Sequence, residues 1–99
     1  MKAFQAAGVD RKPETIASRL LSVRTQRRLT RNQARHRIGY TFDRYADTET
    51  GARLPQPIEL PAIAYDLCDG NLEAFTSALE WLRDRLAIEK VERKSAKIA

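Results

Sequence analysis

The sequence predicts an all-α fold: a compact bundle of about five helices with a helix-turn-helix and a long C-terminal helix. Three observations lead to this prediction. Apolar residues recur at intervals of three and four, which is helical spacing, and no segment alternates convincingly as a strand does. Threonines suited to begin a helix and glycines suited to end one separate the apolar runs. The length of 99 residues leaves room for one small domain.

The chain is expected to have three parts. Residues 1–12 carry no clear periodicity and are expected to form a flexible basic N-terminal arm. Residues 13–92 hold the helical pattern and form the predicted domain, including its C-terminal helix. Residues 93–99 are expected to be a basic tail.

The first helix is expected at about residues 14–27. Pro13 and Glu14 suit a first turn, because proline lacks the amide hydrogen that would be unpaired there and an acid favours the positive helix end. The apolar positions that follow at helical spacing are Ile16, Leu20 and Val23.

A second helix is expected at about residues 31–37. Thr30 is a good N-cap, and Gln33 completes a capping box, in which each side chain bonds the other residue's backbone amide. Gly39 then stops the helix, because glycine adopts positive φ without steric cost.

A third helix is expected at about residues 42–49, with Thr41 as its N-cap. A helix that ends at glycine and another that starts two residues later form a helix-turn-helix pattern. Tyr45 and Thr48 are expected to be buried. The residues expected to point outward are Phe42, Asp43, Arg44 and Asp47.

Two further helices follow a turn-rich loop at residues 50–57. The first is short, runs from Leu60 to Leu67 and has Pro61 in its first turn. The second is long, from about residue 72 into the low nineties, and Asn71 is its expected cap. One apolar stripe on it comprises Leu72, Phe75, Leu79, Leu82 and Leu86, and a second comprises Ala74, Ala78, Trp81 and Ile88.

The net charge of +5 is unevenly distributed. Residues 1–55 hold 12 basic and 5 acidic side chains, for +7, whereas residues 56–99 hold 6 and 8, for −2. Guanidinium groups pair well with phosphate and base edges, so this excess favours a nucleic-acid partner over a solvated basic surface. Between Thr15 and Phe42 there is no acidic residue, and the basic side chains there are Arg19, Arg24, Arg27, Arg28, Arg31, Arg35, Arg37 and His36.

Several other classes of protein are not expected. A single cysteine, Cys68, forms no intramolecular disulfide, and a single histidine supplies no zinc site, so we expect neither metal nor cofactor. We find no signal-peptide core and no run of about 18 apolar residues, and expect a cytoplasmic protein. We expect no enzyme, because the sequence shows no paired carboxylates in a cleft-forming context, no nucleophile elbow and no glycine-rich phosphate loop.

Four motifs in residues 16–76 follow one another in a recognisable order. Residues 16–24 form a helical pattern that ends near an arginine, and Leu29-Thr30 is followed by Ile38-Gly39. Residues 48–55 then contain Glu-x-Gly-x-Arg-x-Pro, and residues 63–67 begin a further helical pattern. In this order they resemble the first helix, the second helix and turn, the segment after the third helix, and the fourth helix of the Cro/repressor class of phage-type helix-turn-helix proteins, also called the lambda-repressor-like or Xre family.

The resemblance implies a sequence-specific transcriptional regulator that reads the major groove of operator DNA. It implies a structural ion pair between Arg24, in the first helix, and Glu49, at the end of the third. Phe42, Asp43 and Asp47 occupy positions that usually reach base edges. The remaining expected DNA-binding residues are Thr30, Arg31, Thr41, Arg44 and Arg53.

A homodimer on a pseudo-palindromic operator is the expected assembly, because one recognition helix reads few bases. Trp81 and Ile88 are the expected dimer contacts, and Trp81 suits the core equally well. Two alternatives keep the same fold: an antitoxin that holds a toxin with residues 1–12 or 89–99, and a protein-interaction module that does not bind DNA.

Overall fold

Five α-helices and two 3-10 turns make up most of residues 14–98, the part of the chain that the computed structural model describes. No strand occurs within these residues, so the predicted all-α class is confirmed. The predicted arm at residues 1–12 lies outside the described range. In chain order the elements are α2 (Ile16–Gln26), α3 (Arg31–Ile38), α4 (Phe42–Thr50), η1 (Pro57–Glu59), α5 (Leu60–Cys68), η2 (Leu72–Ala74) and α6 (Phe75–Ile98).

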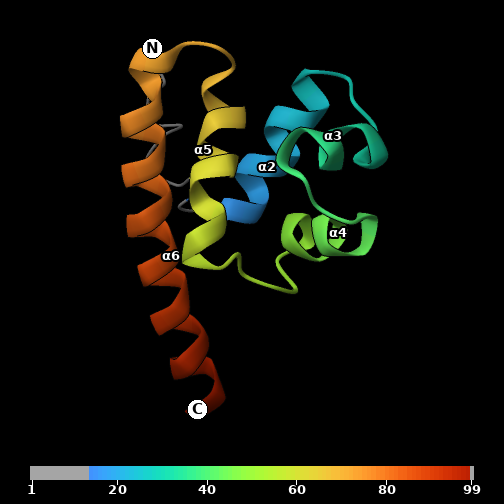
Figure 1. Ribbon diagram of the computed structural model, residues 1–99. Coiled ribbons are helices and arrows are strands. Elements are labelled where there is room, and N and C mark those ends of the chain that lie inside the picture. The colour runs from blue at the N-terminus through green and yellow to red at the C-terminus, as the bar shows by residue number, and fades with distance from the viewer. Residues whose placement is uncertain (1–13, 99) are drawn as a thin grey trace, which may run out of the picture.

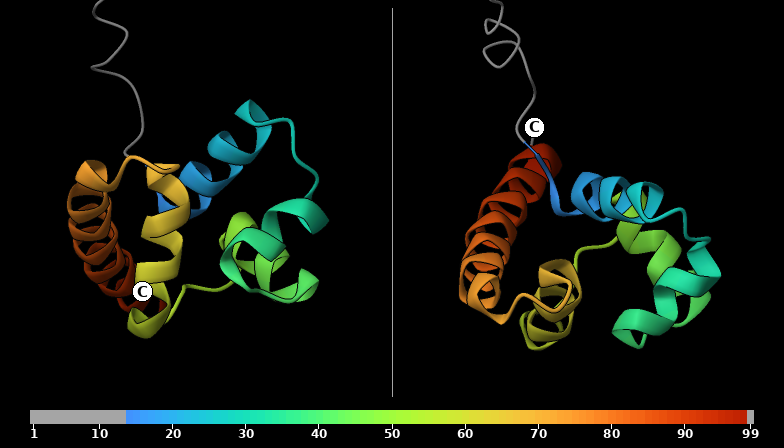
Figure 2. Two further views of the ribbon diagram at one scale, coloured as in Figure 1. Left: turned by 45° about the horizontal axis from the view of Figure 1, so that its top comes forward. Right: turned by 90° about the horizontal axis from the view of Figure 1, so that it is seen from above.

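The helices form two groups joined by α2. α6 runs along one side of the molecule and packs beside α5, while α3 and α4 lie together on the other side (Figures 1 and 2). α2 contacts both α4 and α6, so it links the two groups. None of the helices in the described range is both long enough and apolar enough to cross a lipid bilayer.

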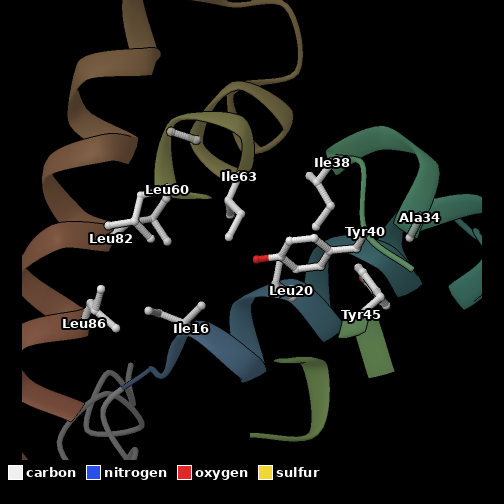
Figure 3. Packing of buried hydrophobic residues seen from close by; sticks show 11 residues of the cluster. Ile16, Leu20, Ala34, Ile38, Tyr40, Tyr45, Leu60, Ile63, Leu82 and Leu86 are labelled. Carbon is white, nitrogen blue, oxygen red and sulfur yellow. The ribbon is translucent and has the colours of Figure 1, made fainter. Parts of the chain in front are cut away.

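One hydrophobic core receives side chains from every α-helix (Figure 3). Ile63, Ala64 and Leu82 have no exposed surface, and Tyr40 carries its ring into the cluster from the connection between α3 and α4. Burial of large apolar side chains is the main favourable contribution to folding. The full cluster is Ile16, Leu20, Ala34, Ile38, Tyr40, Tyr45, Leu60, Ile63, Ala64, Leu82 and Leu86.

Local chemistry at the chain turns defines the ends of α3 as predicted. The Thr30 hydroxyl accepts from the amide of Gln33 at 3.1 Å, and Oε1 of Gln33 accepts from the amide of Thr30 at 2.9 Å. Gly39 ends the helix with φ +75°, a conformation that costs a residue with a Cβ free energy. The capping box and the glycine therefore define both ends of α3 through residues that are close together in the sequence.

The first helix begins later than predicted. Its N-cap is Thr15, whose hydroxyl accepts from the amide of Ser18 at 3.0 Å while the Ser18 hydroxyl lies 2.9 Å from the amide of Thr15. This capping box makes Ile16 the first helical residue, so Glu14 is not in the first turn. Glu14 pairs instead with Arg19 at 2.8 Å.

The C-terminal region also differs from the prediction. Residues 93–98 continue α6 as helix and are not a separate tail. Lysine, arginine and alanine, which dominate this segment, are good helix formers even without an apolar stripe. The predicted cap at the other end is also wrong, because the side chain of Asn71 makes no capping hydrogen bond and a 3-10 turn, η2, precedes α6.

Candidate nucleic-acid interface

Three residues, Gly39 to Thr41, connect α3 to α4, and the middle one anchors the connection in the core. Tyr40 is buried, and its hydroxyl donates to Oε1 of Glu59 at 3.1 Å. Burial and the neighbouring Glu59 carboxylate raise the pKa of Tyr40 to about 12, so the hydroxyl stays a neutral donor. The relative placement of α3 and α4 is therefore tied to the body of the protein.

The C-terminal end of α4 is held by a buried carboxylate. Glu49 has a side chain only 1% exposed and binds Arg24 of α2 through two hydrogen bonds, of 2.6 and 3.1 Å. Arg31, at the start of α3, donates its Nε to the same carboxylate at 2.8 Å. Arg24 also donates to the carbonyl of Leu29 at 2.9 Å. The ion pair expected between Arg24 and Glu49 is thus present, with a second arginine added.

The charge state of Glu49 follows from these contacts. Burial alone would raise the pKa of its carboxyl, but hydrogen bonds from Arg24, Arg31 and Tyr45 outweigh burial and hold the pKa below its usual value. The same network raises the pKa of the Arg24 guanidinium, chiefly through the hydrogen bond to Glu49. Glu49 and Arg24 are therefore ionised at neutral pH, and their contacts, with that of Arg31, fix α4 against α2 and α3.

The N-terminal end of α4 faces solvent. Thr41 accepts from the amide of Arg44 at 3.2 Å and so caps the helix. Phe42 is 47% exposed, which is unusual for a large aromatic side chain, and Asp43 beside it is exposed as well. Phe42 and Asp43, with the capping Thr41, make up the presented end of α4.

Arg44 does not point outward as predicted. Its guanidinium donates to Glu59 at 2.5 Å, lies 5.4 Å from the centre of the Tyr40 ring, and leaves its side chain 17% exposed. Glu59 belongs to η1, fifteen residues later in the chain. At this separation no local sequence pattern predicts that it pairs with Arg44. Arg44 therefore holds α4 against Glu59 and Tyr40 and is not available to contact DNA bases.

Three other predicted DNA-binding residues lie on or near α4 in the chain. Thr30, the exposed N-cap of α3, keeps its hydroxyl at the surface. Asp47 is half-buried, and its carbonyl accepts from the amide of Arg53 at 3.1 Å, which folds the chain back after α4. The Arg53 side chain is exposed, and no carboxylate among the described side chains lies within salt-bridge distance of it.

Many arginines of the arginine-rich segment pair with carboxylates of the same chain. Asp66 of α5 binds Arg27 at 3.0 Å and Arg37 at 2.5 Å, so it joins the ends of α2 and α3. The hydrogen bond to Asp66 is the main reason that the pKa of Arg37 is raised. Arg35 donates to Asn32 at 2.7 Å and to the carbonyl of Tyr40 at 3.3 Å. Most of the predicted cationic surface is therefore part of the framework of the fold.

Sequence reasoning missed two functional partners, Glu59 and Asp66. A signal for them exists in the printed sequence, because they are the first two acidic residues after Glu49 and follow an arginine-rich stretch. Which arginine each one pairs with depends on the tertiary fold. Glu59 removes Arg44 from the predicted DNA-binding residues, and Asp66 pairs with Arg27 and Arg37 of the basic segment.

The two predicted dimer contacts lie in different surroundings. Trp81 is half-buried, packs against the core and has the Arg19 guanidinium 5.2 Å from its ring centre. Ile88, two turns further along α6, is 46% exposed. Ile88 is thus at the surface, while Trp81 lies at the boundary between α2 and α6.

Within residues 14–98 the fold comprises five α-helices, and α4 among them is held at its C-terminal end and partly exposed at its N-terminal end. Comparison with known proteins yields no match to a family model, a curated protein or a solved structure.

Proposed function

We propose that the protein is a sequence-specific DNA-binding regulator in which α3, residues 39–41 and α4 act as a helix-turn-helix. The observation that carries the proposal is the contrast within α4. Its C-terminal end is held by the buried Glu49 network, while Phe42 and Asp43 project at its other end. The major groove, about 12 Å wide, admits one helix whose first residues contact base edges.

The residues near the presented end of α4 supply different parts of recognition. Phe42 makes an apolar contact with a thymine methyl group, and Asp43 accepts from a cytosine amino group. Arg53, exposed after α4, pairs with a phosphate, as do the hydroxyls of Thr30 and Thr41 at two helix N-termini. Arg31 contributes less, because Glu49 already binds its Nε, although its side chain remains 38% exposed.

The experiment that tests this proposal is selection of bound duplexes from a random DNA pool at low salt. Enrichment of a sequence supports the proposal, and the enriched duplex then serves for variant binding. Phe42→Ala is expected to cost about 1–3 kcal/mol and relax the preference at one position. Arg53→Ala is expected to weaken binding to all sequences and to reduce the salt slope by about 1.

Arg83→Ala is the matched control for Arg53→Ala, because it removes an exposed arginine from α6, away from α4. It is expected to leave both the affinity for the selected duplex and the salt slope unchanged. A pool that yields no enriched sequence would overturn the proposal, whatever the affinity for bulk DNA.

A second candidate function, a protein-interaction module, is favoured by the internal pairing of Arg44. Without that guanidinium, the presented end of α4 carries an exposed aromatic ring and a carboxylate, and its own helix adds no exposed cation. Phosphates repel a carboxylate, whereas a basic groove on another protein attracts it. Absence of DNA enrichment together with loss of a protein partner on Phe42→Ala would support this function, and the antitoxin alternative falls within it.

A further inference from the structure

A groove lies between α6 and the junction of η1 with α5. Its volume is about 360 Å³, within the range of about 300–1,000 Å³ that is typical of ligand-binding pockets. Leu60 and Leu86 are buried and form its floor, whereas the other lining residues are exposed. The residues that line it are Pro57, Leu60, Arg83, Leu86, Ala87 and Lys90. We call the hollow defined by these six residues the basic groove.

The middle of the basic groove is apolar and open to solvent. Ala87 is exposed on α6, and its single methyl group leaves space next to Pro57 and Leu86. Ile58, which follows Pro57 in η1, is 84% exposed, the largest exposed fraction among the large apolar side chains of the described residues. Covering apolar groups of this kind with an apolar side chain of a partner is favourable.

Two cations flank the apolar part of the groove. Arg83 and Lys90 are exposed, and among the described side chains no carboxylate lies within salt-bridge distance of either. They are seven residues apart, about two helical turns, so they lie on one face of α6 with Ala87 between them. Lys94, one turn further along and also exposed, continues this face.

No carboxylate lines the basic groove. Glu59 and Glu89 each follow or precede a lining residue in the sequence, but they bind Arg44 and Arg85. Asp84, next to Arg83 in the sequence, is not among the lining residues. The groove therefore combines an apolar floor with positive charge, although residues 56–99 as a whole have a net charge of −2.

We propose that the basic groove binds an acidic helical segment of another protein. In this complex a large apolar side chain of the segment covers Ala87 and contacts Pro57, and its carboxylates pair with Arg83 and Lys90. Hydrogen bonds between carboxylates and cationic donors are stronger than those between neutral groups, and an amphipathic helix commonly binds in such a groove. The proposal does not depend on DNA binding, because none of the six lining residues is among those proposed to contact DNA.

The positions of the two cations set the pattern expected in the partner. Seven residues of helix span about 10 Å, at about 1.5 Å per residue, and this is the separation of Arg83 and Lys90 along α6. A partner helix that lies alongside α6 matches them with acidic residues seven positions apart. Its apolar residue then lies three or four positions after the first acid, opposite Ala87.

Charge and apolar lining favour this occupant over two others. Residues 1–13 hold three basic side chains and one acidic side chain, so their charge has the same sign as that of the groove. A nucleic acid offers phosphates to Arg83 and Lys90, but its phosphates gain nothing from an apolar floor. An acidic segment with an apolar residue suits both the charges and the floor.

Selection from a displayed library of random peptides, with the full-length protein as bait, tests the proposal. Enriched peptides are expected to carry acidic residues seven positions apart with a large apolar residue between them. One enriched peptide is then synthesised with a fluorescent label, and its affinity is measured by fluorescence anisotropy. A library that yields no enriched peptide, or only peptides without acidic residues, would overturn the proposal.

Variants of the protein test where the labelled peptide binds. Lys90→Glu is expected to weaken binding at least about tenfold, because it replaces an attraction by a repulsion, and Lys90→Ala should weaken it in the same direction. Arg28→Glu is the matched control, since it makes the same change of charge at an exposed position between α2 and α3. It should leave the affinity unchanged, and circular dichroism checks that each variant is folded. Equal weakening by Lys90→Glu and Arg28→Glu would overturn the groove as the site.

Exchange of charges across the complex tests the pairing itself. Each acid of the peptide is replaced in turn by lysine. One of these peptides is expected to bind Lys90→Glu more tightly than it binds the natural protein, because the exchanged charges attract again. Failure of every replacement to restore binding would contradict a carboxylate at Lys90.

The remaining outcomes identify other occupants. If no peptide is enriched and Lys90→Glu weakens binding of random duplex DNA, the groove contacts phosphate and the proposal is overturned. If the natural protein self-associates in sedimentation and Lys90→Glu is monomeric, the occupant is a second copy and the proposal is again overturned. A peptide that binds at Lys90 while the DNA pool yields no enriched sequence supports the groove and overturns DNA binding.

Discussion

The two ends of α4 differ in burial, in charge pairing and in what they contact. At the C-terminal end, Thr48 and Glu49 are buried, and the carboxylate is shared by Arg24 and Arg31. At the N-terminal end, Phe42 and Asp43 face solvent. A nine-residue helix is therefore divided into a half that fixes its orientation and a half that is offered to a partner.

This difference teaches how to assign charged residues in a basic segment. Arg24 and Arg31 belong to the arginine-rich stretch that favours a nucleic-acid partner, but both bind a buried carboxylate. A charge that neutralises a buried group stabilises the fold, whereas an exposed one is available to a ligand. The experiments below change the two ends of α4 separately.

The largest effect is expected from Glu49→Ala. Removal of the carboxylate leaves two guanidinium groups without their buried partner, which costs about 3–5 kcal/mol of the free energy of unfolding. Urea denaturation followed by circular dichroism measures the change. Asp43→Ala, at the exposed end of the same helix, is the control and should stay within about 0.5 kcal/mol. Similar losses for both variants would contradict the division of α4.

The contribution of the Glu49 network is expected to depend on pH. The pKa of Glu49 is lower in the folded protein than its usual value of 4.5, so the ionised carboxylate stabilises the fold above about pH 4.5. That contribution is lost as the pH falls through the folded-state pKa. Urea denaturation at pH values from about 3 to 7, which span ordinary carboxyl titration, measures this loss. The free energy of unfolding should fall more steeply towards acid pH for the natural protein than for Glu49→Gln. Parallel curves would refute a depressed pKa.

Loss of a helix cap should have an intermediate effect. Thr30→Ala removes the hydroxyl from the capping box of α3, and Thr41→Ala removes the acceptor for the amide of Arg44. Each is expected to cost about 1 kcal/mol, because one backbone amide loses its partner. Thr30→Ser and Thr41→Ser keep the oxygen and should restore most of the loss in the same urea titration.

The smallest effect on stability is expected at the presented end of α4. Phe42→Ala shortens an exposed side chain and should change the free energy of unfolding by no more than about 0.5 kcal/mol. Its effect should appear in binding to the selected DNA. A large loss of stability would mean that Phe42 belongs to the core and not to the presented end of α4.

Helix boundaries set by local chemistry were predictable from the sequence. Thr30, Gly39 and Thr41 act on backbone groups within four residues of themselves, so their patterns predict the ends of α3 and the start of α4 correctly. The start of α2 lies two residues later than Pro13 and Glu14 predict, because Thr15 and Ser18 form a capping box that makes Ile16 the first helical residue. The C-terminal part of α6 was missed because it lacks a continuous apolar stripe.

The candidate site was predictable only in part, because its ion pairs join distant segments. Spacing alone placed Arg44 on the outside of α4, but Glu59 reaches it from η1 and turns it inward. Asp66 likewise collects Arg27 and Arg37 from two other helices. Such pairings depend on which distant segments the tertiary fold brings together, and local sequence patterns do not predict this. The expected pair of Arg24 and Glu49 came from a family resemblance and not from spacing.

The hydrogen bond from the amide of Ile16 to Glu89 has a consequence for biosynthesis. These residues are 73 positions apart, so the amide at the start of α2 lacks this partner until the last helix has been made. At about 5–20 residues per second, translation takes about 4–15 s to cover that interval. During that interval the amide of Ile16 has no access to the Glu89 carboxylate, so this contact between the start of α2 and α6 forms late in synthesis.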